Sequence, residues 1–200
     1  MKKGKIGIWA IVLIVIAVIA IWFIGARNNF VRMDEKVAGQ WSQVETAYQR
    51  RMDLVNQLVS TVQGDANYER GTLEAVIKAR SEASSVQLTG EDLTEEKIAA
   101  FQKAQDNLQS AMNRAITLTV ERYPELHATE AFQNLMTAVE GSENRISVER
   151  QKFNDSVKKY NQAIRLFPGS IVANLCGFEK KGYFTSSEGA EKAPEIQFDL

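Results

Sequence analysis

The residue types that catalyse reactions or bind metals are scarce in this chain of 200 residues, which has one histidine, His127, and one cysteine, Cys176. A zinc site needs several such ligands, so one copy of the chain cannot build a His-rich or Cys-rich one. The sequence also lacks the patterns of phosphate-binding loops, zinc proteases and serine hydrolases. Carboxylates on exposed helix faces could form an acid–base pair, but solvated faces give the same pattern. We therefore predict no catalytic residue, no metal site and no cofactor.

Polar residues instead recur beside the apolar stripes of two predicted helices. They are Arg50, Arg51, Asp53, Glu143, Asn144, Arg145, Arg150, Asn154 and Asn161. One interpretation is that they flank the helix seam, with their stems covering apolar surface and their heads in water. A second is a polar network across helices that fixes their register. A third is a patch that binds a partner, and the sequence leaves all three open.

The elements that position these residues begin with an apolar run, residues 6–24, which contains no ionisable group. As a helix the run would be about 28 Å long, close to the ~30 Å hydrocarbon core of a bilayer. Trp9, Trp22 and Phe23 lie near its ends, where aromatic side chains favour the membrane interface. We predict that residues 1–27 form a cytoplasmic tip and a transmembrane helix.

A cleaved signal peptide is the alternative, because lysines precede the run. However, the apolar core of a signal peptide usually has about 7–15 residues, and this run is longer. The residues that would precede cleavage, Ile24-Gly25-Ala26, also include a bulky isoleucine. Lys2, Lys3 and Lys5 give the N-terminal side a slight positive bias, which favours that side in the cytoplasm. We expect an uncleaved, single-pass protein whose body lies outside the cytoplasm.

Residues 28–168 are predicted to form an all-α, antiparallel up-and-down bundle of about three to four long helices. Only Gly25 interrupts the approach to the first helix, so the span should continue into it; Gly64-Asp65 is the first expected interruption. Asp92 with Glu95 resembles a capping box, Tyr123-Pro124 should end a helix, and Thr129 is the expected N-cap of the last one. Apolar residues recur at the spacing of one helix face. This predicted core comprises Val37, Trp41, Val44, Tyr48, Val55, Leu58, Val62, Leu73, Val76, Ile77, Ala83, Ile98, Phe101, Leu108, Met112, Ala115, Leu118, Phe132, Leu135, Val139, Ile146, Phe153, Val157, Tyr160, Ile164 and Phe167.

After Pro168 the periodic pattern ends, and residues 169–200 are predicted to form an irregular tail that is first apolar and then acidic. A few buried aromatic side chains often carry most of the binding energy of an interface. We therefore predict that Phe178, Tyr183 and Phe184 dock onto a partner. The alternative is that this segment covers the bundle core as a lid.

The polar residues stand in segments that resemble the LemA family. These segments are residues 41–45 (WSQVE), 50–55 (RRMDLV), 123–126 (YPEL) and 143–146 (ENRI), with Phe153-Asn154, Tyr160-Asn161 and Phe167-Pro168. The resemblance implies an antiparallel helical bundle behind an N-terminal transmembrane helix, in bacterial membranes. With the lysine bias described above, we predict a single pass through the bacterial inner (cytoplasmic) membrane and a periplasmic body. It implies no established activity and supplies no catalytic residue. Asn56 replaces the proline that the family usually has there, so the first helix need not kink.

The chain has a formal charge of −1, and because residues 1–27 carry four positive and no negative side chains, the remainder carries −5. This acidic body argues against binding of nucleic acid or of an anionic lipid surface. We predict a non-catalytic, membrane-anchored interaction protein: a scaffold, adaptor or envelope-organising subunit. Its expected partners are the bilayer and an unidentified protein or a second copy. The alternatives are an envelope sensor that binds a small ligand between helices and a hydrolase that uses carboxylates alone.

Overall fold

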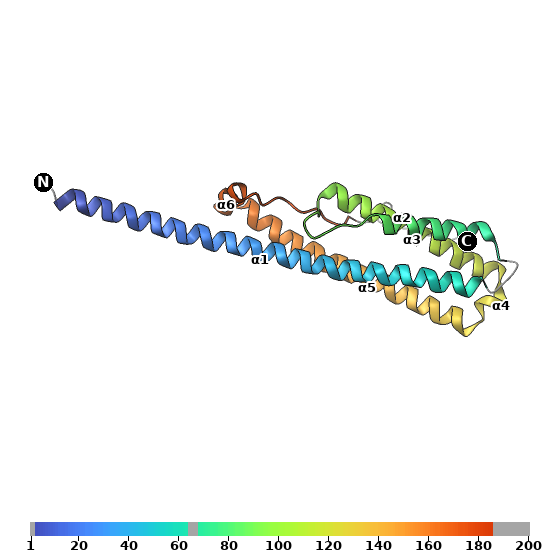
Figure 1. Ribbon diagram of the computed structural model, residues 1–200. Helices are drawn as coiled ribbons and strands as arrows, with labels where there is room; N and C mark the ends of the chain where they lie inside the picture. The colour runs from blue at the N-terminus through green and yellow to red at the C-terminus, as the bar shows by residue number, and fades with distance from the viewer. Residues whose placement is uncertain (1–2, 64–67, 186–200) are drawn as a thin grey trace, which may run out of the picture.

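The computed structural model of the chain describes residues 3–63 and 68–185. Within these ranges the protein is all-α, as predicted, and contains no strand. Its elements are α1 (Lys3–Val62), α2 (Arg70–Ser85), α3 (Glu95–Arg122), α4 (Pro124–His127), α5 (Glu130–Arg165) and α6 (Gly169–Cys176). Figure 1 shows an elongated, antiparallel bundle in which α5 lies along α1, and α2 pairs with α3 away from the N-terminus. The predicted antiparallel bundle of long helices is confirmed.

α1 is continuous from the apolar run into the bundle, as predicted. It has 60 residues, which corresponds to about 90 Å at 1.5 Å per residue. Gly25 is tolerated because one glycine in a helix costs only about 1 kcal/mol relative to alanine. The stretch from Trp9 to Ile24 projects beyond the other helices (Figure 1), and its side chains are exposed except for the partly buried Phe23. By length and composition this helix can cross a membrane. The interruption predicted at Gly64-Asp65 lies outside the described residues.

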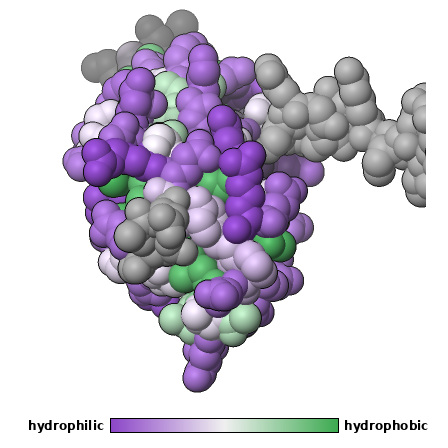
Figure 2. All heavy atoms as spheres, turned by 90° about the vertical axis from the view of Figure 1, so that its right-hand side faces the viewer, coloured by the Kyte–Doolittle hydropathy of each residue, from purple (hydrophilic) through white to green (hydrophobic). Residues whose placement is uncertain are grey.

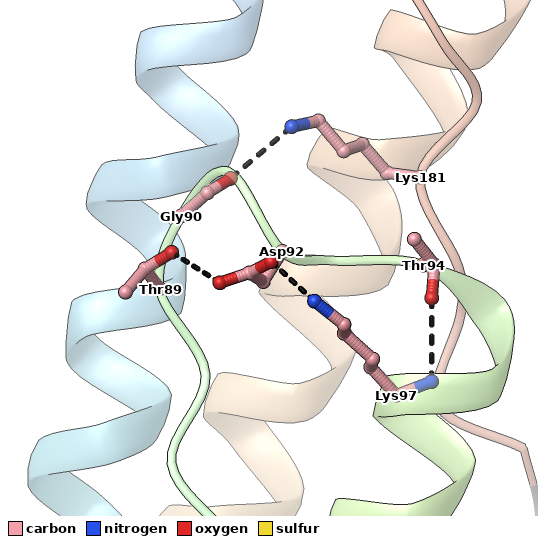
Figure 3. Close-up of polar contacts among 6 residues, drawn as sticks. All are labelled: Thr89, Gly90, Asp92, Thr94, Lys97 and Lys181. Atoms are coloured by element: carbon pink, nitrogen blue, oxygen red, sulfur yellow. Dashed lines mark hydrogen bonds and ion pairs between the residues drawn. The ribbon is translucent and has the colours of Figure 1, made fainter.

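The start of α3 differs from the prediction. The Thr94 hydroxyl accepts a hydrogen bond from the backbone N–H of Lys97 (3.3 Å), so Thr94 is the N-cap. Asp92 instead accepts a hydrogen bond from the Thr89 hydroxyl (2.9 Å) and forms an ion pair with Lys97 (Figure 3). The predicted capping box of Asp92 and Glu95 was wrong, because the helix begins two residues later than the box requires.

The other predicted helix ends are confirmed. Thr129 caps α5 by accepting a hydrogen bond from the backbone N–H of Phe132 (3.3 Å). The break at Tyr123-Pro124 ends α3 and begins the single turn of α4, with proline at a first-turn position. Proline suits that position because its missing N–H would have no partner within the helix. These ends let α5 turn back antiparallel to α3.

The apolar stripes meet in two core clusters. The proximal cluster, nearer the apolar run, is centred on Trp41, whose ring lies 5.2 Å from that of Phe101 and 5.5 Å from that of Phe153. The distal cluster contains Leu54, Leu58, Val76, Leu108, Met112, Phe132 and Leu135. Two predicted core residues are instead exposed: Ile77, which points away from the face that buries its neighbour, and Phe167, which lies beyond the end of α5.

The predicted irregular tail contains a helix and an extended segment. α6 forms because Val172 and Ala173 pack into the proximal cluster. It ends at Gly177, whose φ of 74° is a left-handed conformation that glycine adopts without steric cost. Residues 177–185, called the C-terminal strap below, then run back along the bundle (Figure 1). The acidic end predicted within residues 186–200 lies outside the described residues.

Candidate functional site

Two helices of the bundle are joined by a buried ion pair. The Arg51 guanidinium of α1 donates two hydrogen bonds to the Glu143 carboxylate of α5, at 2.8 and 2.5 Å, and a third to the backbone carbonyl of Gln105 in α3, at 3.3 Å. The Arg51 side chain is 3% exposed and that of Glu143 is 28% exposed. Planar, bidentate pairing of this kind is geometrically specific. The pair therefore fixes the register of α1, α3 and α5 at one level.

A second buried carboxylate, Glu149, lies between α1 and α5. It accepts a hydrogen bond from the Gln40 amide (2.8 Å) and pairs with Arg145 (3.0 Å) and Lys152 (3.1 Å). Burial raises the pKa of Glu149, but the hydrogen bonds from Lys152 and Gln40 and the nearby positive charges outweigh burial and hold the pKa below its ordinary value. Sequence reasoning missed this residue. The available signal was its position three residues after Ile146, on the apolar face of the helix.

Two asparagines of α5 hold the C-terminal strap. Asn161 donates to the backbone carbonyl of Lys181 (2.8 Å) and accepts from its N–H (3.0 Å). Asn154 makes the same two bonds with Phe184, at 2.8 and 2.9 Å. Each carboxamide thus satisfies a backbone donor and a backbone acceptor of a segment that pairs with no strand within residues 3–63 and 68–185. The asparagines predicted beside the apolar stripe act here as backbone clamps.

The spacing of these clamps matches the geometry of the strap. Seven residues separate Asn154 from Asn161, which is about 10.5 Å along a helix. Three residues separate Lys181 from Phe184, which is about 10 Å in extended chain. Only an extended strap can therefore meet both asparagines, and their order makes it antiparallel to α5.

The strap also contacts α3. Gln102, a buried residue of α3, donates to the Thr185 carbonyl (3.0 Å) and accepts from its N–H (3.2 Å). The Gly182 N–H donates to the Leu93 carbonyl (2.8 Å), and a Cβ at Gly182 would lie 2.6 Å from the Cα of Glu95. Glycine is required there because the two backbones approach too closely for a side chain. The strap therefore closes the groove between α3 and α5.

The aromatic residues predicted to dock onto a partner have different positions. Phe184 is buried, with its ring stacked 5.9 Å from that of Trp41 and with the Arg150 guanidinium 4.8 Å from its centroid. Phe178 is partly buried against Phe30, at 5.5 Å between ring centroids. Tyr183 is 40% exposed. Phe184 thus occupies the position that the lid interpretation describes, and Tyr183 is the most accessible of the three.

Lys181 ties the strap to two further elements. Its ammonium donates to the Gly90 carbonyl (3.1 Å), in the turn before α3, as Figure 3 shows. The same ammonium lies 3.2 Å from the Asp34 carboxylate of α1. Nothing periodic in the sequence marks Lys181, because its partners belong to segments far from it along the chain. The turn, α1 and the strap are therefore held at one point.

The remaining predicted residues are more accessible. Arg50, Asn144 and Arg145 are exposed, and Asp53 is partly buried and accepts a hydrogen bond from Gln49 (3.3 Å). In the apolar run, Trp9 is 69% and Trp22 is 41% exposed. Among the described residues, no group of histidine, cysteine, aspartate and glutamate side chains gathers to hold a metal ion. The polar contacts that the structure does bring together join helices and fasten the strap.

A cavity of about 240 Å³ opens between α1, α2 and α3. Glu45, Arg80 and Gln105 are among the residues that line it. Gln105 is buried, and within the described part of the chain its side-chain oxygen Oε1 has no hydrogen-bond partner. Partial burial raises the pKa of Glu45 above its ordinary value. The cavity therefore combines an unused acceptor with charged groups of both signs.

Comparison with known proteins identifies the family. The model of the LemA family matches residues 40–198. The chain belongs to the LemA family. The predicted resemblance is thus confirmed over most of the sequence, including the strap and the helices that hold it.

Named relatives of this LemA-family chain include magnetosome proteins. It is 28% identical over 174 residues to the magnetosome protein MamQ of Magnetospirillum gryphiswaldense, matching 78% of this chain and 64% of that protein. It is 27% identical over 174 residues, with the same 78% and 64% coverage, to magnetosome protein MamQ 2 of Paramagnetospirillum magneticum. It is 22% identical over 166 residues to protein LemA of Metamycoplasma hominis, covering 83% of this chain and 72% of that protein. The chain thus spans 64% of the length of these MamQ relatives.

Proposed function

We propose that this LemA-family protein is a non-catalytic, membrane-anchored interaction protein, acting as a scaffold, adaptor or envelope-organising subunit. In this proposal α1 crosses the bacterial cytoplasmic membrane once, and the bundle lies on the periplasmic side. The lysines that precede the span support this orientation. The family and its relatives named MamQ and LemA support a membrane-associated, non-enzymatic role.

The continuity of α1 is the observation that carries the proposal. The same helix supplies the apolar run and one side of the bundle, without a break over its 60 residues. From Gly25 to Val62 it extends roughly 55 Å at 1.5 Å per residue. Because α5 packs along this length and the strap fastens α5 to α3, the bundle is a stiff rod joined to its anchor. Such a rod holds a binding surface at a fixed height above a membrane.

The surface offered to a partner is polar. Arg50, Asn144 and Arg145 are exposed on the two longest helices, and the end of the bundle farthest from the N-terminus is mainly hydrophilic, with small separate apolar areas (Figure 2). An interface of this composition suits a soluble protein with a polar surface better than a second membrane helix. A second copy of the chain is the other candidate occupant.

Site-specific photo-crosslinking in native membranes tests this proposal. A photoreactive amino acid at Arg50 or Arg145 should give one discrete adduct, which mass spectrometry then identifies as a protein or as a second copy. The same amino acid at Glu121, an exposed residue of α3, provides the matched control. Adducts of equal yield from all three positions, or from none, would contradict a partner surface on α1 and α5.

The cavity between α1, α2 and α3 favours a second candidate function, the binding of a small ligand. Bundles commonly bind small molecules between their helices. A ligand with an N–H or O–H donor would satisfy Oε1 of Gln105, the oxygen that has no partner among the described residues, once the Gln105 side chain turns this buried atom toward the cavity. Leaving a buried acceptor unsatisfied costs about 1–3 kcal/mol, so a ligand that satisfies it gains a comparable advantage.

This second function can be tested by titrating the protein with acetamide, isopropanol and phenol. The NMR signals of the Gln105 side-chain amide report binding. A saturable shift that disappears in a Ser84→Phe variant would support binding, because Ser84 also lines the cavity. Shifts that do not saturate, or that persist unchanged in the variant, would contradict it.

A further inference from the structure

Large apolar side chains are concentrated on the surface at one end of the bundle. Leu166, Phe167, Ile171 and Leu175 are 65%, 81%, 49% and 73% exposed, and they lie within ten residues of one another at the junction of α5 and α6. The exposed large apolar residues elsewhere on the described bundle, such as Ile77, are scattered singly. Isolated apolar residues are normal on protein surfaces, whereas a cluster at one place indicates a surface that is covered in use.

This cluster lies beside the end of the membrane-spanning run. The inner face of α6, through Val172 and Ala173, belongs to the proximal cluster together with Phe30 of α1. Phe23 and Ala26 are partly buried against the same cluster, and Phe23 is itself part of the apolar run that ends at residue 24. Figure 1 shows α6 next to α1 where the helix leaves the bundle toward its N-terminus. α6 is therefore level with the last turn of the run and the residues just beyond it.

Exposed basic residues lie at this level, together with the exposed Glu179 and the uncharged Asn28 and Asn29. Arg27 and Arg32 of α1 and Arg165 at the end of α5 are exposed. Arg27 is three residues beyond Ile24, or about 4.5 Å along the helix, which is within the headgroup region of about 5–7 Å on each side of the hydrocarbon core. Basic side chains at that depth are attracted to anionic phospholipid headgroups. Basic side chains are therefore available at the end of the bundle nearest the apolar run, although the body as a whole is acidic.

We propose that α6 and the turn before it lie in the interface of the bilayer leaflet from which α1 emerges. The side chains of Phe167, Ile171 and Leu175 enter the upper part of the acyl chains, and the nearby arginines contact the headgroups. An amphipathic segment in the plane of the interface buries its apolar face in this way. The occupant is lipid because the cluster is level with the membrane-spanning run, and the packing of α6 on α1 fixes it there. This inference rests on the proposed anchoring by α1, and it gives the bundle a second attachment that fixes its tilt.

Fluorescence of an environment-sensitive label tests the inference on the full-length chain. In a Cys176→Ser background, Ile171→Cys and Leu175→Cys are labelled with the NBD fluorophore. The chain is reconstituted in vesicles of phosphatidylcholine and phosphatidylglycerol. The matched control is Ile77→Cys, because Ile77 and Ile171 are both 49% exposed. Lipids with a nitroxide on the upper acyl chain should quench the labels at 171 and 175 several-fold more than the label at 77.

The possible outcomes separate this inference from the anchoring on which it rests. Flotation with vesicles reports anchoring, and circular dichroism checks that each variant keeps its helices. A chain that floats but whose labels at 171 and 175 are quenched no more than the label at 77 would overturn the inference alone. Labels shielded from aqueous iodide yet insensitive to nitroxide lipids would overturn it too, and would indicate a protein contact. A chain that does not float would overturn both proposals.

Discussion

Removing Glu143 and removing Arg51 from their ion pair should lower the free energy of unfolding by different amounts. Glu143→Leu leaves the Arg51 guanidinium, whose side chain is 3% exposed, as a buried charge with only the Gln105 carbonyl as a hydrogen-bond partner. Removing one partner of a buried pair in this way costs about 3–5 kcal/mol. Arg51→Met instead leaves Glu143, which is 28% exposed and accessible to water. This variant loses the hydrogen bonds to Glu143 and leaves the buried Gln105 carbonyl without its donor. The free energy of unfolding should then fall by about 1–3 kcal/mol.

The double variant, Arg51→Met with Glu143→Leu, should be about as stable as Arg51→Met alone, because no unpaired charge remains. Urea unfolding of the full-length chain in detergent micelles, followed by far-ultraviolet circular dichroism, gives the free energy of unfolding of all four proteins. The difference between the double variant and the sum of the single variants measures the coupling. It should equal the loss in Glu143→Leu alone, about 3–5 kcal/mol, which is at or above the upper end of the range of about 0.5–3 kcal/mol usual for residues in contact. Equal losses for the two single variants that simply add in the double variant would refute the assignment of Arg51 as the buried partner.

Four further predictions concern the core, the strap, pH and topology. Phe153→Ala should lower the free energy of unfolding by about 3–5 kcal/mol because Phe153 is fully buried, whereas Ile77→Ala should change it by about 0.5 kcal/mol or less; similar urea midpoints would contradict the core assignment. Replacing both Asn154 and Asn161 with alanine should speed proteolysis within the strap, while Asn144→Ala should leave the cleavage pattern unchanged. The stabilisation from Glu149 should be complete above its unfolded-state pKa of about 4.3 and be lost as the pH falls through the lower folded-state pKa. Glu149→Gln should therefore flatten the pH dependence of the free energy of unfolding in this range. An unchanged pH dependence in the variant would contradict the role of Glu149. In a Cys176→Ser background, Ser60→Cys should react with a membrane-impermeant maleimide in intact spheroplasts, and protection until lysis would place the bundle in the cytoplasm.

Much of the fold could be predicted because its helices carry their own signals. The stripe from Val37 through Trp41 to Leu58 repeats at helical spacing, and each of these residues is buried in α1. Thr129 and Tyr123-Pro124 mark helix ends by local chemistry alone. Such features depend on residues within a few positions of one another, which a sequence displays directly.

The strap could not be predicted in the same way. Its residues have no period, and its hydrogen-bond partners lie far away in the sequence, 83 residues in the case of Gln102 and Thr185. The signal that was present, two asparagines seven positions apart on one helix, becomes meaningful only when an extended segment is known to lie beside them. Phe184 is a similar case, because an aromatic residue near a chain end fits a docking surface and a core position equally well. Lys181 could not be predicted either, because its partners Gly90 and Asp34 lie far from it in the sequence.

The strap places a constraint on how the protein is made. Phe184 packs against Trp41, Phe101 and Phe153, yet the ribosome adds it only after those three residues and after α6. Until it emerges, the proximal cluster lacks one of its rings and the groove between α3 and α5 stays open. Transiently exposed apolar surface of this kind attracts chaperones and proteases. A chain truncated before residue 184 would therefore keep α1 to α6 and still expose this surface, so that the strap completes the proximal cluster only after these helices have been made.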